Sequence, residues 1–298
     1  MRKNISIFAL FITSAIWGLA FVAQRQGMEL LDPFLFNGIR FALGAVFIGC
    51  FGFQRIIRHK GFPWSLGLVL FLGATFQQTG LIWSTAGNAG FITGLYVVFV
   101  PILGLFRSQR IKPQILYAVC LSLFGLYLIN DNQDITVSFS NALILIGAVF
   151  WAVHLQLIDK LNKSYDYLYL AFIQFSVCAC LSFFFGILYN LVFQTRMLFS
   201  QELFLNVGKA GLPLLYSGLV SVGIAYTLQV FAQKRVEPAK SAIILCLESV
   251  FALWGGWLLL GETITPAALL GAGMLLLAML ISIKVTPWKR ISVFNRVK

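Results

Sequence analysis

Long apolar stretches alternate with short polar breaks along the whole sequence. Each stretch has the length of about 20 residues that an α-helix needs to cross the hydrocarbon core of a bilayer. In windows of about 19 residues, the pattern predicts ten membrane-spanning helices, over residues 5–24, 33–53, 64–83, 88–106, 112–130, 139–158, 167–193, 210–232, 238–260 and 264–284. Prolines at positions 33, 113, 238 and 266 fall in the opening turn of a predicted helix, where the missing N–H does no harm. The chain is therefore predicted to be an all-α integral membrane protein.

Composition supports this class of protein. Of the 298 residues, 59% are hydrophobic and only 11% are charged, whereas roughly a quarter are charged in a soluble globular domain. Ten helices use nearly the whole length, so we expect no separate soluble catalytic module. The five cysteines all lie in apolar stretches, with no spacing typical of a disulfide framework or a zinc site. We expect neither a metal nor another cofactor.

The positive charges indicate the orientation. Lysine and arginine gather in alternate connecting segments, at residues 1–4, 54–63, 107–113, 159–166, 233–240 and 284–298, and cytoplasmic segments retain such charge. The segments between them hold only Arg25, Arg196 and Lys209, and Arg40 lies inside a predicted span. Both termini are therefore predicted to be cytoplasmic, with the first apolar stretch a span rather than a secretory signal. The net charge of +12 is dispersed over short loops, so we expect no nucleic-acid partner.

The two halves of the chain are weakly similar to each other. Residues 15–18 align with 149–152, and at the same offset 34–41 align with 168–175. Five spans in each half would make the second half enter the membrane from the opposite side, an arrangement that places a solute site near the bilayer midplane. The alternative is chance resemblance between apolar sequences. The predicted units are two inverted five-helix repeats over 1–132 and 133–286 and a basic cytoplasmic tail over 287–298.

Charged side chains at membrane depth are informative, because they are costly in lipid and usually face a cavity or a partner. Glu248 lies about ten residues, or roughly 15 Å, into the ninth predicted helix. It is a candidate for proton coupling or for binding a cationic group, and the alternative is a buried hydrogen bond to a neighbouring helix. Arg40, inside the second predicted helix, is a candidate for binding a carboxylate or for a gate. The alternative is that Arg40 reaches the interface or pairs with Asp32 or Glu29.

Neutral polar and aromatic residues extend the set of candidates. His154 follows Trp151 by one turn and could relay protons, although a lone histidine can equally be a packing residue. Trp17, Phe21 and Gln24 share one face of the first predicted helix, which could hold an organic solute or pack against another helix. Glutamine and tyrosine side chains in the third, fourth and eighth helices indicate a wet lining, although helix packing uses such groups too. The candidate substrate-binding or coupling residues are Glu248, Arg40, Trp17, Gln77, Tyr96, His154, Trp151, Tyr226 and Gln229.

Short motifs in a fixed order give the chain a resemblance to a known family. They are Ile16-Trp17-Gly18, Ile39-Arg40-Phe41, residues 88–91 with 98–101, Leu247-Glu248, and Leu260-Gly261-Glu262. By their order and spacing the chain resembles the ten-helix, EamA-type branch of the drug/metabolite transporter superfamily. The resemblance implies an inner-membrane secondary carrier that moves small metabolites, often outward, by alternating access around a central cavity. It marks Trp17, Arg40, Glu248 and Glu262 as motif positions without assigning their roles. Ser249 stands where the family usually has proline, so we expect a less interrupted ninth helix.

These patterns together predict a secondary active transporter of small metabolites, and the resemblance implies that it lies in the bacterial inner membrane and exports its solute. Amino acids and amines suit a cavity with one acid, one base and several aromatic rings, and protons are a candidate coupling ion. A membrane enzyme is disfavoured because two histidines and no metal-ligand spacing make no catalytic cluster. A primary pump is disfavoured because the sequence has no phosphate-binding loop. A non-transporting scaffold or receptor stays open, and no pattern indicates an oligomeric state.

Overall fold

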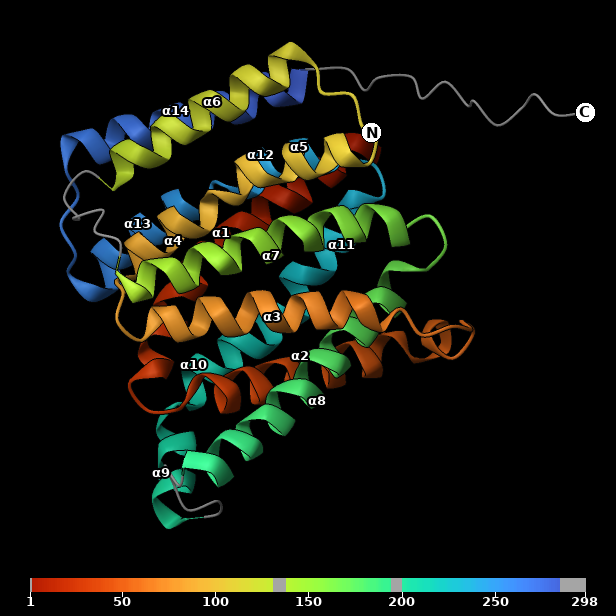
Figure 1. Cartoon of the computed structure of the whole chain (residues 1–298), viewed down its shortest axis with the longest axis vertical. Helices are drawn as coiled ribbons and strands as arrows, with labels where there is room; N and C mark the ends of the chain where they lie inside the picture. The colour runs from red at the N-terminus through yellow and green to blue at the C-terminus, as the bar shows by residue number, and fades with distance from the viewer. Residues whose placement is uncertain (1, 131–137, 194–199, 285–298) are drawn as a thin grey trace, which may run out of the picture.

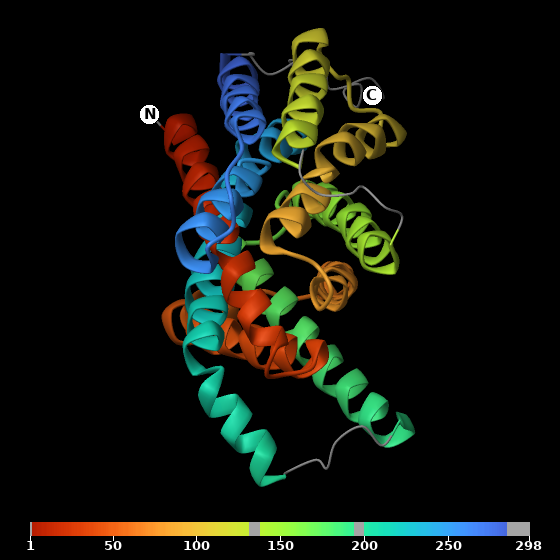
Figure 2. The same cartoon turned by 90° about the vertical axis from the view of Figure 1, so that its left-hand side faces the viewer.

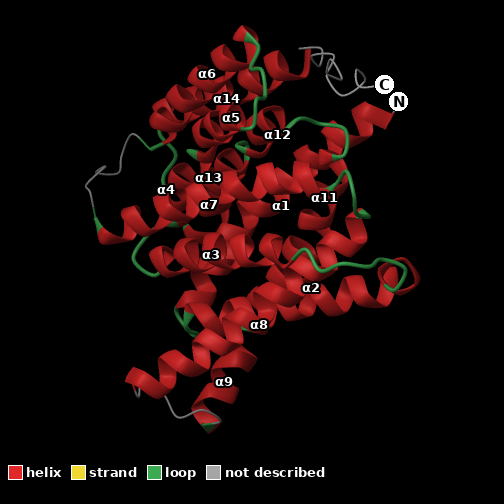
Figure 3. Ribbon diagram, turned by 45° about the vertical axis from the view of Figure 1, so that its right-hand side comes forward, coloured by secondary structure: helices red, strands yellow, loops and turns green. Residues whose placement is uncertain are grey.

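The computed structural model describes residues 2–130, 138–193 and 200–284, and every regular element in these ranges is a helix (Figures 1 and 3). The predicted basic tail, 287–298, lies outside the described residues. The helices are α1 (Arg2–Met28), α2 (Pro33–Ile56), α3 (Trp64–Leu81), α4 (Ala86–Gly94), α5 (Tyr96–Phe106), α6 (Pro113–Ile129), α7 (Phe139–Leu161), α8 (Tyr167–Phe193), α9 (Gln201–Lys209), α10 (Gly211–Leu215), the π-helix η1 (Tyr216–Tyr226), α11 (Thr227–Gln233), α12 (Pro238–Leu245), α13 (Glu248–Leu260) and α14 (Pro266–Lys284).

Each of the ten predicted ranges contains helical segments, so the all-α class is confirmed. Eight helical stretches of the described residues are long and apolar enough to cross a membrane. The two ranges outside this set are α3, which carries the polar pair Gln77 and Gln78, and α6, which has 17 residues. Eight spans are therefore supported by length and composition, and ten crossings stay a prediction.

Prolines and side-chain caps define where the helices begin. The four prolines at positions 33, 113, 238 and 266 each open a helix, as the sequence predicts. The Asp32 carboxylate accepts a hydrogen bond from the Leu35 N–H at 2.9 Å and so caps α2. Thr85 caps α4 in the same way, by accepting from the Asn88 N–H at 3.1 Å. These local signals position the helices that carry the candidate residues.

Three apolar stretches are not single α-helices. In the fourth, α4 ends at Gly94 and α5 begins at Tyr96; in the eighth, η1 is a π-helix between α10 and α11. In the ninth, α12 ends at Leu245 and α13 begins at Glu248. Discontinuous helices of this kind line solute sites in many secondary transporters.

The expectation that Ser249 leaves the ninth helix less interrupted is wrong. The helix breaks at Cys246 and Leu247 without any proline. The side chains at the break bond instead to backbone carbonyls of α4: the Ser249 hydroxyl donates to the Gly90 oxygen at 2.8 Å, and the Cys246 thiol lies 3.7 Å from the Gly94 oxygen. Tertiary contacts therefore stabilise an interruption that the local sequence does not require.

Helices from the two halves of the chain pack against each other in pairs. The pairs are α1 with α13, α2 with α8, α3 with α7, and α6 with α14. The pair α6–α14 lies at one end of the molecule, at the top of Figure 1. It packs so closely that a Cβ atom at Gly271 would lie 2.3 Å from the Gly125 oxygen. At the other end, the last part of α8 and the α9–α10 segment extend beyond the other helices (Figure 2). The short helix α9 was not foreseen from the sequence.

The connections rich in lysine and arginine lie on one side of the molecule. The α2–α3 and α7–α8 connections are both on the right in Figure 1, whereas the α1–α2 and α13–α14 connections are on the left. The charge asymmetry along the sequence is thus a charge asymmetry in space. The cytoplasmic position of the termini stays a prediction.

Candidate functional site

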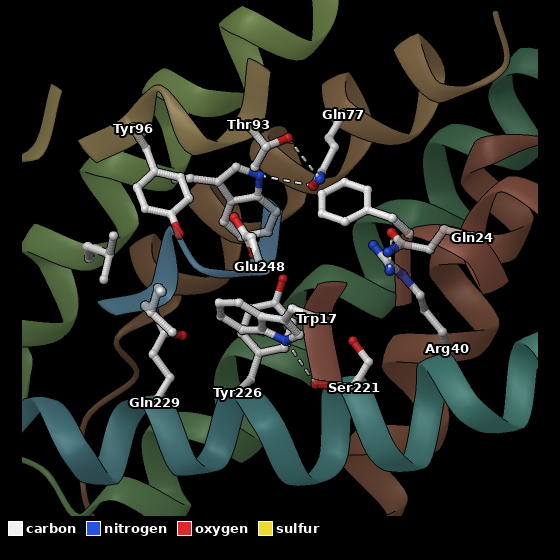
Figure 4. Close-up of a pocket in the computed structure, with 14 residues that line it drawn as sticks. Trp17, Gln24, Arg40, Gln77, Thr93, Tyr96, Ser221, Tyr226, Gln229 and Glu248 are labelled. Carbon is white, nitrogen blue, oxygen red and sulfur yellow. Dashed lines mark hydrogen bonds between the residues drawn. The ribbon is translucent and has the colours of Figure 1, made fainter. Parts of the chain in front are cut away.

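A cavity lies between the two halves of the chain (Figure 4). Seven of its lining residues precede residue 132 and seven follow it. They are Trp17, Phe21, Gln24, Arg40, Gln77, Thr93, Tyr96, Trp151, Leu155, Ser221, Tyr226, Gln229, Leu245 and Glu248. Eight of the nine sequence candidates line this one cavity, and the exception is His154.

Glu248 is the acid of the cavity, and the break in the ninth helix places it there. It is the first residue of α13, and only 3% of its surface is exposed. Its Oε1 atom is buried without a hydrogen-bond partner. Tyr96, the first residue of α5 after the break in the fourth helix, points its hydroxyl towards Glu248 (Figure 4). Buried polar atoms usually have hydrogen-bond partners, so a carboxyl oxygen without one is available to a further group. It can accept a proton or a hydrogen bond from a solute.

Arg40 is the base of the cavity and is only 2% exposed. Its Nη1 atom donates to Gln24 Oε1 at 2.6 Å, and its guanidinium carbon lies 4.8 Å from the centroid of the Phe41 ring. The alternative that Arg40 reaches the interface or pairs with Asp32 or Glu29 is wrong. Asp32 caps α2 instead, and neither Asp32 nor Glu29 forms an ion pair with Arg40.

Aromatic rings from three helices meet around Tyr226. The centroid of the Tyr226 ring lies 4.5 Å from that of Trp17 and 6.0 Å from that of Trp151. Both indoles also donate hydrogen bonds: Trp17 Nε1 to the Ser221 oxygen at 3.3 Å, and Trp151 Nε1 to Gln77 Oε1 at 3.0 Å. These bonds hold the ring planes in position, so they form a rigid aromatic wall between α1, α7 and η1.

His154 does not line the cavity. It is fully buried beside Trp151, at 5.8 Å between ring centroids, and its Nε2 atom lies 2.8 Å from Gln174 Oε1. This environment fits the packing alternative rather than a proton relay.

Several cavity residues were not singled out as candidates from the sequence. Leu155 and Leu245 carry no signal, because leucine is common on every face of a membrane helix. Gln24 does carry one: it shares with Trp17 and Phe21 the helical face that was expected to hold a solute or to pack, although it was not among the nine candidate residues.

Glu262, the second carboxylate of the motifs, lies away from the cavity in the connection between α13 and α14. Burial raises the pKa of Glu262, while a hydrogen bond from the Ala86 N–H and the nearby Arg25 act in the opposite direction. Glu262 thus links the end of α13 to the first turn of α4, where helix N–H groups lack intrahelical partners. Within the described residues, no three His, Cys, Asp or Glu side chains gather as metal ligands would.

Comparison with known proteins shows the family. The model of the EamA-like transporter family matches residues 4–131 and 138–284. The chain belongs to this family. A protein of Archaeoglobus fulgidus, named "Uncharacterized transporter", is 30% identical over 284 residues, which are 94% of this chain and 86% of that protein.

Two further relatives carry more specific names. Proteins of Salmonella typhimurium and Escherichia coli, 25% and 24% identical, are each named "Probable amino-acid metabolite efflux pump". The matches cover 95% and 97% of this chain and 96% and 98% of those proteins. A solved crystal structure matches 93% of this chain and 96% of its own with a TM-score of 0.73, and at 17% identity it shows the fold alone. This EamA-like chain is thus an integral membrane transporter of the plasma membrane.

Proposed function

We propose that the protein is a secondary active transporter that exports small amino compounds, amino acids and amines among them, by alternating access. The observation that carries the proposal is the cavity between the two halves, in which an acid and a base are buried without pairing to each other. A non-transporting scaffold needs no such cavity. The names of the two enterobacterial relatives support an amino-acid metabolite as the solute.

The proposed architecture is ten spans in two inverted repeats, over 1–132 and 133–286. Three observations support it: the family model matches two segments of similar length, 4–131 and 138–284, helical segments occupy all ten predicted ranges, and helices of one half pack on helices of the other. In such transporters one repeat rocks against the other around a fixed site. The solute site would then be the cavity, which takes half of its lining from each repeat.

Glu248 is proposed to receive the cationic amino group of the solute or, in its absence, a proton. One carboxylate cannot hold both, so the binding of one displaces the other. Mutual displacement at a single site is the minimum that proton–solute exchange requires. The unpartnered Oε1 atom and the nearby Tyr96 hydroxyl support this role.

The proposal is tested with purified protein in liposomes loaded with a labelled amino acid or amine. We expect efflux to accelerate when an inward proton gradient is imposed, and Glu248→Gln to abolish this acceleration. Glu202→Gln is the matched control, because Glu202 is exposed on α9 and lies outside the cavity. Proton coupling is refuted if Glu248→Gln responds to the gradient as the wild type does. Transport itself is refuted if no solute of either class leaves faster than from protein-free liposomes.

A further inference from the structure

Arg40 is a buried cation that forms no ion pair with any residue that the structure describes. The ion pairs among the described residues are Arg55–Asp166 and Arg107–Asp159, and neither involves Arg40. Its Nε atom is buried without a hydrogen-bond partner. The Phe41 and Phe36 rings, whose centroids lie 4.8 and 5.8 Å from the guanidinium carbon, attract the cation but carry no charge. The arginine end of the cavity therefore keeps a positive charge and a free donor.

Gln24 holds Arg40 without neutralising it. Its Oε1 atom accepts the bond from Arg40 Nη1, and its Nε2 atom donates to the Ala20 oxygen in its own helix at 3.1 Å. These two bonds fix the orientation of the amide, so that the oxygen faces the guanidinium. A glutamate in the same place would pair with the guanidinium as a charge-assisted, bidentate contact. The single difference between an amide and a carboxylate thus decides whether Arg40 remains available to an anion.

Arg40 and Gln24 lie on one side of Glu248, and Tyr96 and Gln229 lie on the other (Figure 4). Arg40, Gln24 and Glu248 all line the same cavity. A solute that spans from Arg40 to Glu248 passes the aromatic wall of Trp17 and Tyr226. The cavity therefore offers a cationic end, an apolar middle and an anionic group.

We propose that Arg40 binds a carboxylate of the transported solute and that Gln24 determines this specificity by giving Arg40 a neutral partner. The proposal rests on the proposed transport function and narrows it: the preferred solutes are zwitterions with an apolar body, and amines without a carboxylate bind weakly. The Nε atom and the outer guanidinium N–H groups bind the carboxylate, while Glu248 binds the ammonium group.

The test compares three matched solutes on the purified full-length protein. Phenylalanine has the carboxylate, phenylalaninamide has the same skeleton with the charge removed, and phenethylamine lacks the group. Dissociation constants are measured by calorimetry for the wild type and for Gln24→Glu, Gln24→Ala and Gln26→Glu. Gln26 is exposed two residues further along α1 and lies outside the cavity, so its variant introduces the same charge without reaching Arg40.

We expect the wild type and Gln26→Glu to bind phenylalanine on the order of tenfold or more tightly than the other two solutes. Gln24→Glu is expected to lose this preference, with phenylalanine weakened by at least about tenfold and the two amines unchanged. Gln24→Ala leaves Arg40 charged and is expected to keep the preference for the carboxylate. The Gln24→Ala result separates a role in specificity from a role in folding.

Besides equal binding of all three solutes by the wild type, three results overturn the proposal. The first is a Gln24→Glu protein that still prefers phenylalanine, and the second is a Gln24→Ala protein that loses the preference as Gln24→Glu does. The third is an amine that binds as tightly as phenylalanine in the presence of chloride but not in its absence. Arg40 would then bind chloride together with the amine rather than a carboxylate of the solute. A wild type that binds none of the three solutes contradicts the proposed function itself, whereas equal binding of all three contradicts only the role of Arg40.

Discussion

Replacement of Gly18 by alanine is expected to destabilise the protein by forcing α1 away from α13. A Cβ atom at this position would lie 2.3 Å from the Cβ of Phe251, 2.5 Å from the Glu248 oxygen and 2.8 Å from the Ala252 nitrogen. Two of these atoms belong to the backbone and the third is fixed to it, so no side-chain rotation can relieve the contact. Ordinary van der Waals contact begins at 3.4 Å, and the two helices therefore have to separate by about 1 Å.

The expected magnitude follows from two opposing effects. Overpacking of this kind costs about 1–3 kcal/mol, with the upper end applying to rigid neighbours. Alanine is the better helix former by about 1 kcal/mol, which leaves a net loss of about 2 kcal/mol. At roughly 2–4 °C per kcal/mol for a chain of this size, the melting temperature should fall by about 4–8 °C. Because the contact joins the neighbour of Trp17 to Glu248, solute affinity should fall as well.

The assay is thermal unfolding of the detergent-purified protein, followed by tryptophan fluorescence. Gly273→Ala is the matched control, since Gly273 lies in α14 and a Cβ atom there meets nothing within 4 Å. That variant should melt at the wild-type temperature or slightly above it. Equal melting temperatures for the two variants would refute the close packing of α1 on α13.

Three further predictions concern single contacts. Trp151→Phe removes the hydrogen-bond donor to Gln77 Oε1 and should lower the free energy of unfolding by about 1–2 kcal/mol. The melting temperature should therefore fall, and an unchanged melting temperature would contradict this prediction. Asp166→Asn breaks a 3.7 Å ion pair whose Arg55 side chain is 54% exposed, so chemical denaturation should show a change below about 0.5 kcal/mol, and a larger loss would contradict this. Burial raises the pKa of Glu262, so the folded protein is more stable when this carboxyl is protonated, and that stability is lost as the pH rises. The melting temperature of the wild type should therefore rise relative to that of Glu262→Gln as the pH falls from 7 towards 4.5. A difference between the two melting temperatures that does not change with pH would contradict the reasoning.

The hydrophobic pattern was sufficient for the helical ranges, because lipid and the backbone hydrogen-bond requirement leave helices as the only structure for such stretches. It did not reveal the interruption of the ninth helix. The break depends on bonds from Cys246 and Ser249 to carbonyls of α4, and contacts more than 150 residues apart leave no trace in a local pattern. The π-helix at Tyr216–Tyr226 was likewise not visible, and α9 was too short and too mixed in polarity to be distinguished from a loop.

The candidate site was largely found from the rarity of polar groups in apolar helices. Glu248 and Arg40 could be identified in this way because a charged side chain at membrane depth is costly and is usually found at a functional site. Their partners could not: Gln24 bonds to Arg40 from another helix, and nothing in the sequence states which helices are neighbours. The same limitation explains His154, whose polarity made it a candidate although it bonds to Gln174 away from the cavity.

The central claim is that the cavity between the two halves belongs to a carrier, and labelled-solute counterflow tests it most directly. Liposomes containing the purified protein are loaded with unlabelled amino acid and diluted into a trace of the same compound in labelled form. A carrier that alternates access exchanges the two, so we expect the label to accumulate transiently inside above its external concentration. Label that never accumulates above that of protein-free liposomes, for any amino acid or amine in the panel, would contradict the account.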